Sequence, residues 1–233
     1  MSLPVFHLPD LTGEVLFLDG PEGRHAATVR RLRVGEQVDL VDGLGTRCTC
    51  TVSAVTRESL TCQVEERVVQ PAPAPRLTLV QALAKGSRGE LAVELATEVG
   101  VDEIVPWAAS RSIVKWHDDK PLERWRSTAR EAAKQSRRAW FPQVAEPVTT
   151  TQAAALPGQL LVLHEAASTA LGEVPLSGDV VLVVGPEGGI SEEELEVFQR
   201  AGALAVRLGP SVLRTSTAGA VAAALVSSRT GRW

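Results

Sequence analysis

Short apolar runs alternate with helix-like stretches along the last two thirds of the chain. The clearest of these runs cover residues 77–83, 103–109, 159–165 and 179–185. Strands that are apolar on both faces are typical of parallel sheets, because helices cover such a sheet on both sides. The alternation therefore predicts an α/β domain with a parallel sheet, and periodicity alone would suggest a doubly wound sheet.

The first seventy residues follow a different pattern. Four β-rich runs cover residues 14–20, 37–45, 47–56 and 60–69. Asp-Gly pairs at Asp19-Gly20 and Asp42-Gly43 mark turns, and residues 22–32 predict one helix. These features indicate a small β-barrel crossed by a helix.

The segment "QPAPAP" at residues 70–75 separates the two patterns. Alternating Pro and Ala resist both helix and sheet and favour an extended spacer. We therefore expect a first domain at residues 1–70, a linker at 71–75 and a second domain at 76–233.

Composition bounds the possible classes of protein. The chain has 233 residues, 44% of them hydrophobic, which is enough to bury a substantial core. It has no apolar span of membrane length and no signal-like start, so we expect a cytoplasmic protein without a membrane partner. Its three cysteines, Cys48, Cys50 and Cys62, have no histidine nearby, so we expect reduced thiols and no metal site.

The basic residues are unevenly distributed although the net charge is −4. Residues 24–33 contain four arginines and no acid, and residues 120–140 contain seven basic residues against two acidic ones. Local basic patches attract nucleic-acid phosphate even on an acidic protein, although each patch alone could be an ordinary solvated helix face.

Two Gly-Pro loops lie between apolar runs and helices, in residues 182–196 and 207–225. In the first loop, Ser191 and Glu194 form the pattern of a capping box. Gly188 and Gly189 have no side chains, so their backbone amides can contact a ligand directly. Neither the P-loop pattern nor the dinucleotide fingerprint is present. A small-molecule site at the carboxyl end of a parallel strand is one interpretation, and a tight turn without a ligand is the other.

The loops carry a resemblance to a known family. "GPEGGIS" (185–191) followed by "LGPSVLRTSTA" (208–218) resembles the end of the RsmE family, the 16S ribosomal RNA (uracil-N(3))-methyltransferases of the SPOUT superfamily. Further similar stretches are "HAATVRRLRVGEQVDLVDGLG" (25–45), "ALAKGSRGELAVELATEVGV" (82–101) and "EAAKQSRRAWFPQV" (131–144). The four motifs follow the family order over nearly the whole chain.

The resemblance implies a fold and an activity. The fold is a C-terminal SPOUT α/β domain with a deep trefoil knot plus a small N-terminal PUA-like β-barrel, in a homodimer formed through the knotted region. A knot is an exception to the rule that chains do not thread their own loops. The activity is methylation of N(3) of a uridine in 16S ribosomal RNA of the small (30S) subunit, with S-adenosyl-L-methionine held between the two loops.

The family pattern also implies site residues. Those that match its cofactor pocket are Leu163, Gly185, Glu187, Gly188, Leu208, Gly209, Leu213 and Thr215. Glu187 has two possible roles, facing the charged end of the cofactor or stabilising the following helix terminus.

Methyl transfer to a uracil ring nitrogen needs a stabilised imide anion. A cation beside the uracil oxygens would supply this, and Arg214 in "VLRTST" is our candidate catalytic residue. The alternative for Arg214 is phosphate or partner-subunit binding. The base stays open among water, His164 and Glu165.

Phosphate contacts are expected from the basic patches. The candidate RNA-binding residues are Arg24, Arg30, Arg31 and Arg33 in the small domain and Arg137 and Arg138 in the large one. Lys134 stands where the family usually has an acid, Arg137 where it usually has Gly, and Leu95 where Lys is common.

Two other functions remain possible from the sequence. One is a different SPOUT methyltransferase that acts on ribose or on transfer RNA. The other is a non-catalytic RNA-binding ribosome factor that uses the barrel and the basic helix alone. Four of the five tryptophans lie between residues 107 and 140, where core packing is favoured over base stacking.

Overall fold

The computed structural model describes residues 3–233, which form two compact units. The described residues of the first unit run up to Ala72 and include Ala133–Phe141, and the second unit comprises Pro73–Ala132 and Pro142–Trp233. Among the described residues, no helix is both long and apolar enough to cross a membrane.

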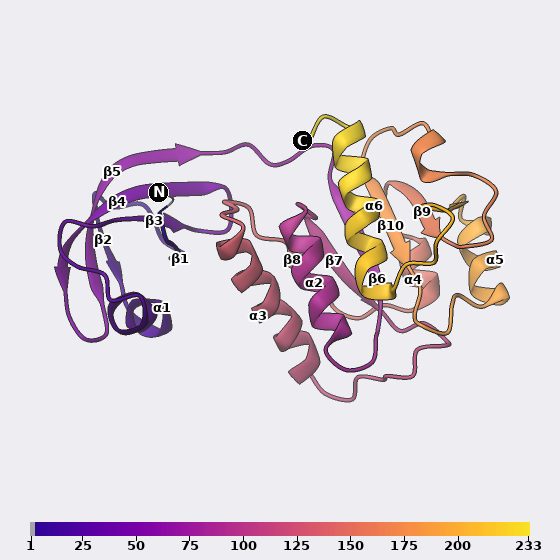
Figure 1. The fold of residues 1–233 in the computed structure, drawn as a ribbon, viewed down its shortest axis with the longest axis horizontal. Coiled ribbons are helices and arrows are strands. Elements are labelled where there is room, and N and C mark those ends of the chain that lie inside the picture. The colour runs from indigo at the N-terminus through magenta and orange to yellow at the C-terminus, as the bar shows by residue number, and fades with distance from the viewer. Residues whose placement is uncertain (1–2) are drawn as a thin grey trace. The chain divides into compact units, whose positions relative to one another are not determined.

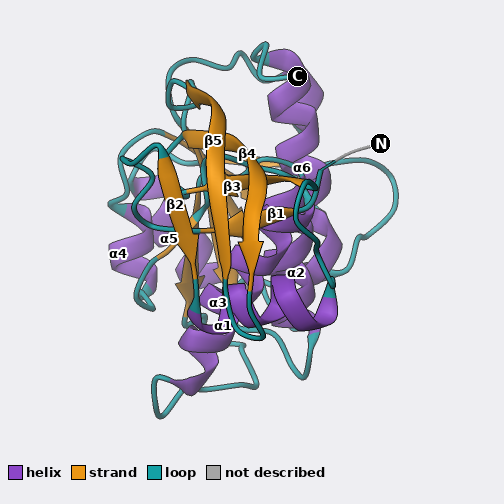
Figure 2. Ribbon diagram, turned by 90° about the vertical axis from the view of Figure 1, so that its left-hand side faces the viewer, coloured by secondary structure: helices purple, strands orange, loops and turns teal. Residues whose placement is uncertain are grey.

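The first unit contains a curled five-stranded sheet with the order β1-β3-β4-β5-β2 (Figure 2). Its strands are β1 (Val5–His7), β2 (Val15–Leu18), β3 (Gln37–Val41), β4 (Thr46–Val55) and β5 (Leu60–Val69). All pairs are antiparallel except β1 with β3. The four strands predicted from the sequence are confirmed, and β1 was not anticipated.

Helical residues connect β2 and β3. The single predicted helix is α1 (Gly20–Arg24), which continues as a π-helical turn (His25–Val29). The turn predicted at Asp19-Gly20 is wrong, because Asp19 is the N-cap of α1. The turn at Asp42-Gly43 is confirmed, since Asp42 Oδ1 accepts the amides of Leu44 and Thr46 at 2.7 and 2.9 Å.

Residues 133–141 belong to the first unit although they lie far along the chain. The indole of Trp140 donates to the carbonyl of Gln70 at 3.0 Å, and the amide of Phe141 donates to the carbonyl of Gly43 at 2.9 Å. Arg137 and Arg138, which we expected in the large domain, therefore group by their contacts with the first unit. Helix periodicity identified the basic helix but gave no sign of the unit against which its end packs.

Two arginines of the first unit have left-handed backbones. Among residues 3–233, the residues other than glycine with positive φ are Arg31 at 55° and Arg137 at 56°. Left-handed backbone favours glycine, because a Cβ atom crowds the following carbonyl. The glycine that is usual at position 137 in the resembled family fits this conformation.

The second unit is built on a six-stranded parallel sheet with the order β11-β9-β10-β6-β7-β8 (Figure 1). Its strands are β6 (Leu77–Ala82), β7 (Glu103–Trp107), β8 (Gln143–Val144), β9 (Gln159–Leu163), β10 (Val180–Val184) and β11 (Leu204–Val206). Its helices are α2 (Arg88–Glu98), most of α3 (Lys120–Gln135), α4 (Thr150–Ala154), a 3-10 turn (Leu171–Glu173), α5 (Glu192–Arg200) and α6 (Thr215–Arg229). The predicted parallel sheet is confirmed.

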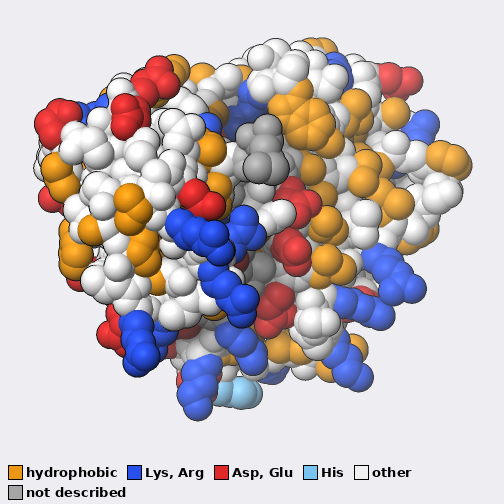
Figure 3. Space-filling model, turned by 60° about the vertical axis from the view of Figure 1, so that its left-hand side comes forward, with side chains coloured by type: hydrophobic (Ala, Val, Ile, Leu, Met, Phe, Trp, Pro, Cys, Tyr) orange, Lys and Arg blue, Asp and Glu red, His pale blue; other side chains and the backbone are white. Residues whose placement is uncertain are grey.

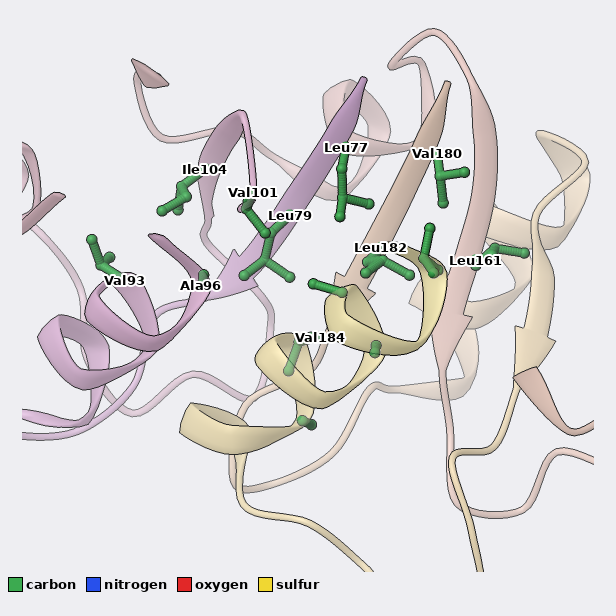
Figure 4. Close-up of a cluster of buried hydrophobic side chains, with 14 of the residues drawn as sticks. Leu77, Leu79, Val93, Ala96, Val101, Ile104, Leu161, Val180, Leu182 and Val184 are labelled. Atoms are coloured by element: carbon green, nitrogen blue, oxygen red, sulfur yellow. The ribbon is translucent and has the colours of Figure 1, made fainter. Parts of the chain in front are cut away.

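Helices cover both faces of this sheet, which explains the apolar runs. Leu77, Leu79 and Leu182 face a cluster that includes α2, α3 and α6 (Figure 4). The alternate residues Val80 and Val181 face a second cluster that includes α4 and α5. Each strand therefore buries both faces, as parallel strands between helices do.

Helix α6 packs closely on the sheet because it is built from small residues. A Cβ atom on Gly219 would lie 3.0 Å from the Leu79 side chain, so the helix approaches β6 at a distance that a larger residue would prevent. The Ala and Gly content of α6 therefore accounts for its close packing on the sheet.

Two tryptophans are core residues, as predicted. Trp107 and Trp125 are 0% and 3% exposed, and Trp107 meets Phe198 edge to face with ring centroids 5.3 Å apart. Trp116 and Trp140 are partly buried. Large aromatic side chains contribute much of the burial energy of such cores.

The thiols of the first unit should resist alkylation. Burial raises the pKa of Cys50 to about 12 and that of Cys62 to about 11, against an ordinary value of 9.0, and it also raises the pKa of Cys48. Because the thiolate is the reactive form, we expect negligible labelling by iodoacetamide at pH 8 in the folded protein and labelling of all three cysteines in urea. Mass spectrometry of peptides would measure this, and rapid labelling of Cys50 in native buffer would contradict it.

Candidate functional site

A cavity of about 1040 Å³ opens at the carboxyl ends of β9, β10 and β11. These three strands end side by side, because Leu163 pairs with Val184 on one side and with Val206 on the other. The loops that leave the strands therefore converge at one edge of the sheet. Ligands of parallel α/β sheets bind at such carboxyl edges.

The structure brings the residues predicted for the cofactor pocket into this one cavity. Its lining includes Leu163, Gly185, Glu187, Gly188, Leu208, Gly209, Leu213 and Thr215, together with the predicted catalytic residue Arg214. Both Gly-Pro loops thus contribute to a single site. His164 and Glu165, the candidate bases, line the same cavity.

The first loop is shaped by its glycines. A Cβ atom on Gly185 would lie 2.6 Å from the Ile190 side chain, and Gly189 has a φ of +74°. The loop ends at α5 with the predicted capping box, in which the side chains of Ser191 and Glu194 each accept the other residue's amide. The loop is therefore fixed at both ends, and its backbone borders the cavity.

The hydroxyl of Thr215 ties the second loop to the first. Its Oγ1 donates to the carbonyl of Gly185 at 2.7 Å and accepts from Nε2 of Gln81 at 3.0 Å. Gln81 is fully buried on β6 and Thr215 is 7% exposed, so the bond between them lies away from water, whereas the bond to Gly185 is partly buried. The predicted cofactor residue Thr215 thus uses its side chain to hold the two loops together.

Glu187 forms an ion pair that the sequence did not suggest. Its Oε1 lies 3.2 Å from Nη1 of Arg88, at the start of α2, and 3.4 Å from the amide of Lys85. Arg88 lines the cavity and was missed, because no motif marks it. Its position just after the strand end of β6 is the signal that could have identified it.

Arg214 begins α6 as its N-cap residue. Its carbonyl accepts the amides of Thr217 and Ala218, each at 2.9 Å, so its backbone is fixed while its side chain is exposed. A guanidinium at the wall of a cavity can stabilise negative charge that develops inside it.

Arg111 is a second missed residue of the cavity wall. It lies in the turn after β7, and its Nη1 is 3.3 Å from the carbonyl of Gly188 and 3.5 Å from that of Ile190. The turn is fixed by Glu194, which accepts the amide of Ser110 at 2.7 Å and its hydroxyl at 2.9 Å.

Glu194 stays ionised although it is only 6% exposed. Burial raises the pKa of this carboxyl, but hydrogen bonds from Ser110, Ser191 and Thr150 together outweigh it and lower the pKa below 4.5. A carboxylate that accepts several such bonds is favoured in its charged form. The capping residue read from the sequence is therefore also the anchor of the β7 turn and of α4.

The predicted RNA-binding residues all belong to the first unit. Five of the six side chains are exposed, and that of Arg138 is partly buried; the exposed ones are Arg24, Arg30, Arg31, Arg33 and Arg137. Arg24 pairs with Glu58 at 3.1 Å, an exposed contact of little energetic weight. Lys and Arg side chains gather on the face that Figure 3 turns toward the viewer.

The chain is similar to known proteins over nearly its whole length. Residues 70–227 match a family model described as an RNA methyltransferase domain, and residues 18–65 match one described as an RNA methyltransferase PUA domain. The chain is 48% identical to the ribosomal RNA small subunit methyltransferase E of Mycobacterium bovis, over 97% of this chain and 90% of that protein.

Two solved structures are similar over nearly their whole length. One is a ribosomal RNA small subunit methyltransferase E from Neisseria gonorrhoeae bound to S-adenosyl methionine, with a TM-score of 0.90 and 29% identity over 98% of each chain. The other is a putative methyltransferase from Legionella pneumophila with bound SAM, with the same TM-score, identity and coverage.

Removing the hydroxyl of Thr215 should loosen both loops. Thr215→Val leaves Gly185 without its donor and Gln81 without an acceptor, so we expect the free energy of unfolding to fall by about 1–3 kcal/mol. Thr215→Ser keeps the hydroxyl and serves as the control, with an expected loss of at most about 1 kcal/mol for one methyl group. Urea titration measures both variants, and equal stability of the two would refute the role of the hydroxyl.

The Glu194 anchor predicts a pH dependence of stability. A lowered folded-state pKa stabilises the protein above the ordinary value of 4.5, and this contribution is lost as the pH falls through the folded-state pKa. Glu194→Gln should therefore be less stable than wild type at pH 7, and the difference should shrink below pH 4.5. Melting temperatures between pH 7 and pH 3 test this, and a constant difference would contradict it.

Proposed function

The chain belongs to the ribosomal RNA small subunit methyltransferase E family, and we propose that it methylates N(3) of a uridine in 16S RNA of the small (30S) subunit with S-adenosylmethionine. The observation that carries this proposal is the single cavity that the two Gly-Pro loops line at the carboxyl ends of β10 and β11, on either side of β9. Because the proposed substrate is ribosomal RNA, and ribosomes assemble in the cytoplasm, we propose that the protein acts in the cytoplasm.

The cavity fits S-adenosylmethionine in size and chemistry. Ligand pockets of about 300–1,000 Å³ are usual, and this one combines apolar walls with bare backbone. In our proposal Leu163, Leu208 and Leu213 enclose the adenine, while the backbone at Gly185, Gly188 and Gly209 supplies polar contacts. Glu187 and Thr215 complete the pocket, Glu187 with its carboxylate held by Arg88.

The cofactor supplies an electrophilic methyl group on a sulfonium, which an in-line displacement transfers. The protein's task is then largely to position the two reactants. Arg214 lies where its guanidinium can stabilise the charge that appears on the uracil oxygens when N(3) loses its proton. His164, Glu165 and water are the candidate acceptors of that proton.

The first unit supplies RNA binding in this proposal. Residues 1–70 act as a PUA-like barrel, residues 71–75 as a linker and residues 76–233 as the methyltransferase domain. Phosphate contacts come from Arg24, Arg30, Arg31, Arg33, Arg137 and Arg138. The match of residues 18–65 to an RNA methyltransferase PUA domain supports this assignment. The target uridine must leave its stack to reach the cavity.

We also propose the deep trefoil knot for residues 76–233. The supporting contacts join the end of β11 and the end of the last helix to the connection between β9 and β10. Directly after β11, Arg207 forms a parallel bridge with Ala170, and at the end of α6 Arg229 donates to the carbonyls of Leu171 and Val174 at 2.9 and 2.8 Å.

A homodimer through this region is part of the proposal. Val212 in the second loop and Val221 on α6 are 78% and 41% exposed, so this region offers apolar side chains that a second copy of the chain can bury. Sedimentation of the purified chain measures the assembly state.

Methylation of small ribosomal subunits tests the activity. Subunits from cells lacking this protein are incubated with it and labelled S-adenosylmethionine, and the RNA is digested to nucleosides for mass spectrometry. We expect 3-methyluridine. A ribose methyl group, or label only in transfer RNA, would favour a different SPOUT enzyme. Cofactor binding without transfer would favour a ribosome-binding factor.

Arg214 should act through the shape and charge of its guanidinium. We expect Arg214→Lys and Arg214→Ala to lower kcat by roughly 10²-fold or more, as loss of an oxyanion-stabilising donor does, with a nearly unchanged Kd for the cofactor. Single-turnover assays and calorimetry separate the two effects. If Arg214→Lys kept the wild-type kcat, the proposed role would be wrong.

A further inference from the structure

Arg111 is fixed at the rim of the cavity by a turn that the first loop itself holds. The turn follows β7, and its Ser110 gives both its amide and its hydroxyl to Glu194 of α5. A Cβ atom on Gly188 would lie 3.2 Å from that of Arg111, so the base of the arginine packs against the first loop. The backbone and the Cβ atom of Arg111 are therefore held beside the first loop, although the residue is exposed.

The contacts of Arg111 leave its charge available. Its guanidinium donates to the carbonyls of Gly188 and Ile190 at 3.3 and 3.5 Å, both long for hydrogen bonds. Within residues 3–233, no carboxylate lies within 4.0 Å of the guanidinium of Arg111 or of Arg214. The pKa of Glu193 is lowered by hydrogen bonds from its own backbone and from Ser191, and also by the charge of Arg111, so this carboxylate interacts with Arg111 without forming an ion pair. Arg88, by contrast, is paired with Glu187, and Arg207 donates to the carbonyls of Ala167 and Ser168.

The two unpaired guanidiniums belong to different parts of the rim. Arg214 comes from the start of α6, and Arg111 comes from the turn beside the first loop. An enzyme that takes a base out of its stack must hold the flanking backbone while the base enters the pocket. Arg is well suited to this task, because its fork binds phosphate oxygens in pairs.

We infer that Arg111 is a further RNA-binding residue of this site, which holds a backbone phosphate next to the target uridine. The inference rests on the proposed function. It divides the work between two arginines, since Arg214 acts on the base and Arg111 on the backbone. It also assigns Glu194 a positioning role, because this carboxylate fixes the turn that carries Arg111.

The test compares Arg111→Ala and Arg111→Lys with a matched control, Arg200→Ala. Arg200 is an exposed arginine of the same unit, paired with Glu196 on α5, and it does not line the cavity. For each variant we would measure kcat and KM with small subunits, the Kd for S-adenosylhomocysteine by calorimetry, and the salt dependence of binding to small subunits without cofactor.

Loss of one phosphate contact has a distinct signature. We expect Arg111→Ala to raise KM for small subunits about tenfold and to lower the salt slope of log K by about one unit. Its Kd for S-adenosylhomocysteine should stay within about twofold of wild type, because the proposed role of Arg111 includes no cofactor contact. Arg111→Lys should recover part of the RNA affinity, because Lys binds phosphate as a point charge.

Two outcomes would overturn the inference. A weakened Kd for S-adenosylhomocysteine with an unchanged salt slope would mean that Arg111 binds the cofactor carboxylate. Values equal to those of Arg200→Ala would mean that it binds neither. Failure of the proposed function is seen separately, as absence of 3-methyluridine with wild-type protein, and the binding measurements do not depend on turnover.

Discussion

The hydrogen bonds of the Thr215 hydroxyl are the contact on which the site depends. They join β6, the end of β10 and the start of α6, three segments that span more than half of the chain. The two Gly-Pro loops leave the sheet at β10 and β11, which are separated by β9, and the Thr215 hydroxyl bonds the start of α6 directly to the end of β10. The bond from Gln81 is buried, and a hydrogen bond shielded from water is electrostatically stronger than one in water.

The sequence predicted the sheets well and the short elements poorly. The apolar runs of β6, β7, β9 and β10 are long enough to reveal burial on both faces, and so they were found. The strands β1 and β8 and the helix α4 have only two to five residues, which is too short for any periodicity to appear. The grouping of residues 133–141 with the first unit depends on contacts between distant segments, which no local pattern records.

The residues of the site likewise fall into those that local sequence patterns identify and those that depend on contacts between distant segments. The two loops could be located from their glycines and prolines, since these residues specify turns directly. Arg88 and Arg111 were missed, because no motif marks them. Each follows the end of a different strand, and this position is a signal only once the order of strands in the sheet is known. Glu194 was recognised from local spacing as a capping residue, whereas its bonds to Ser110 and Thr150 link segments 84 and 44 residues away.

Arg31 and Arg137 have left-handed backbones, which cost conformational energy, but both residues contribute positive charge to the surface. A left-handed arginine costs about 1–2 kcal/mol relative to a right-handed one, and glycine would avoid most of that cost. Selection for thermal stability alone would therefore replace both residues with glycine and would remove two cations from the proposed RNA-binding surface. A stabilised version of this enzyme designed by backbone criteria would lose charge where its substrate is expected to bind.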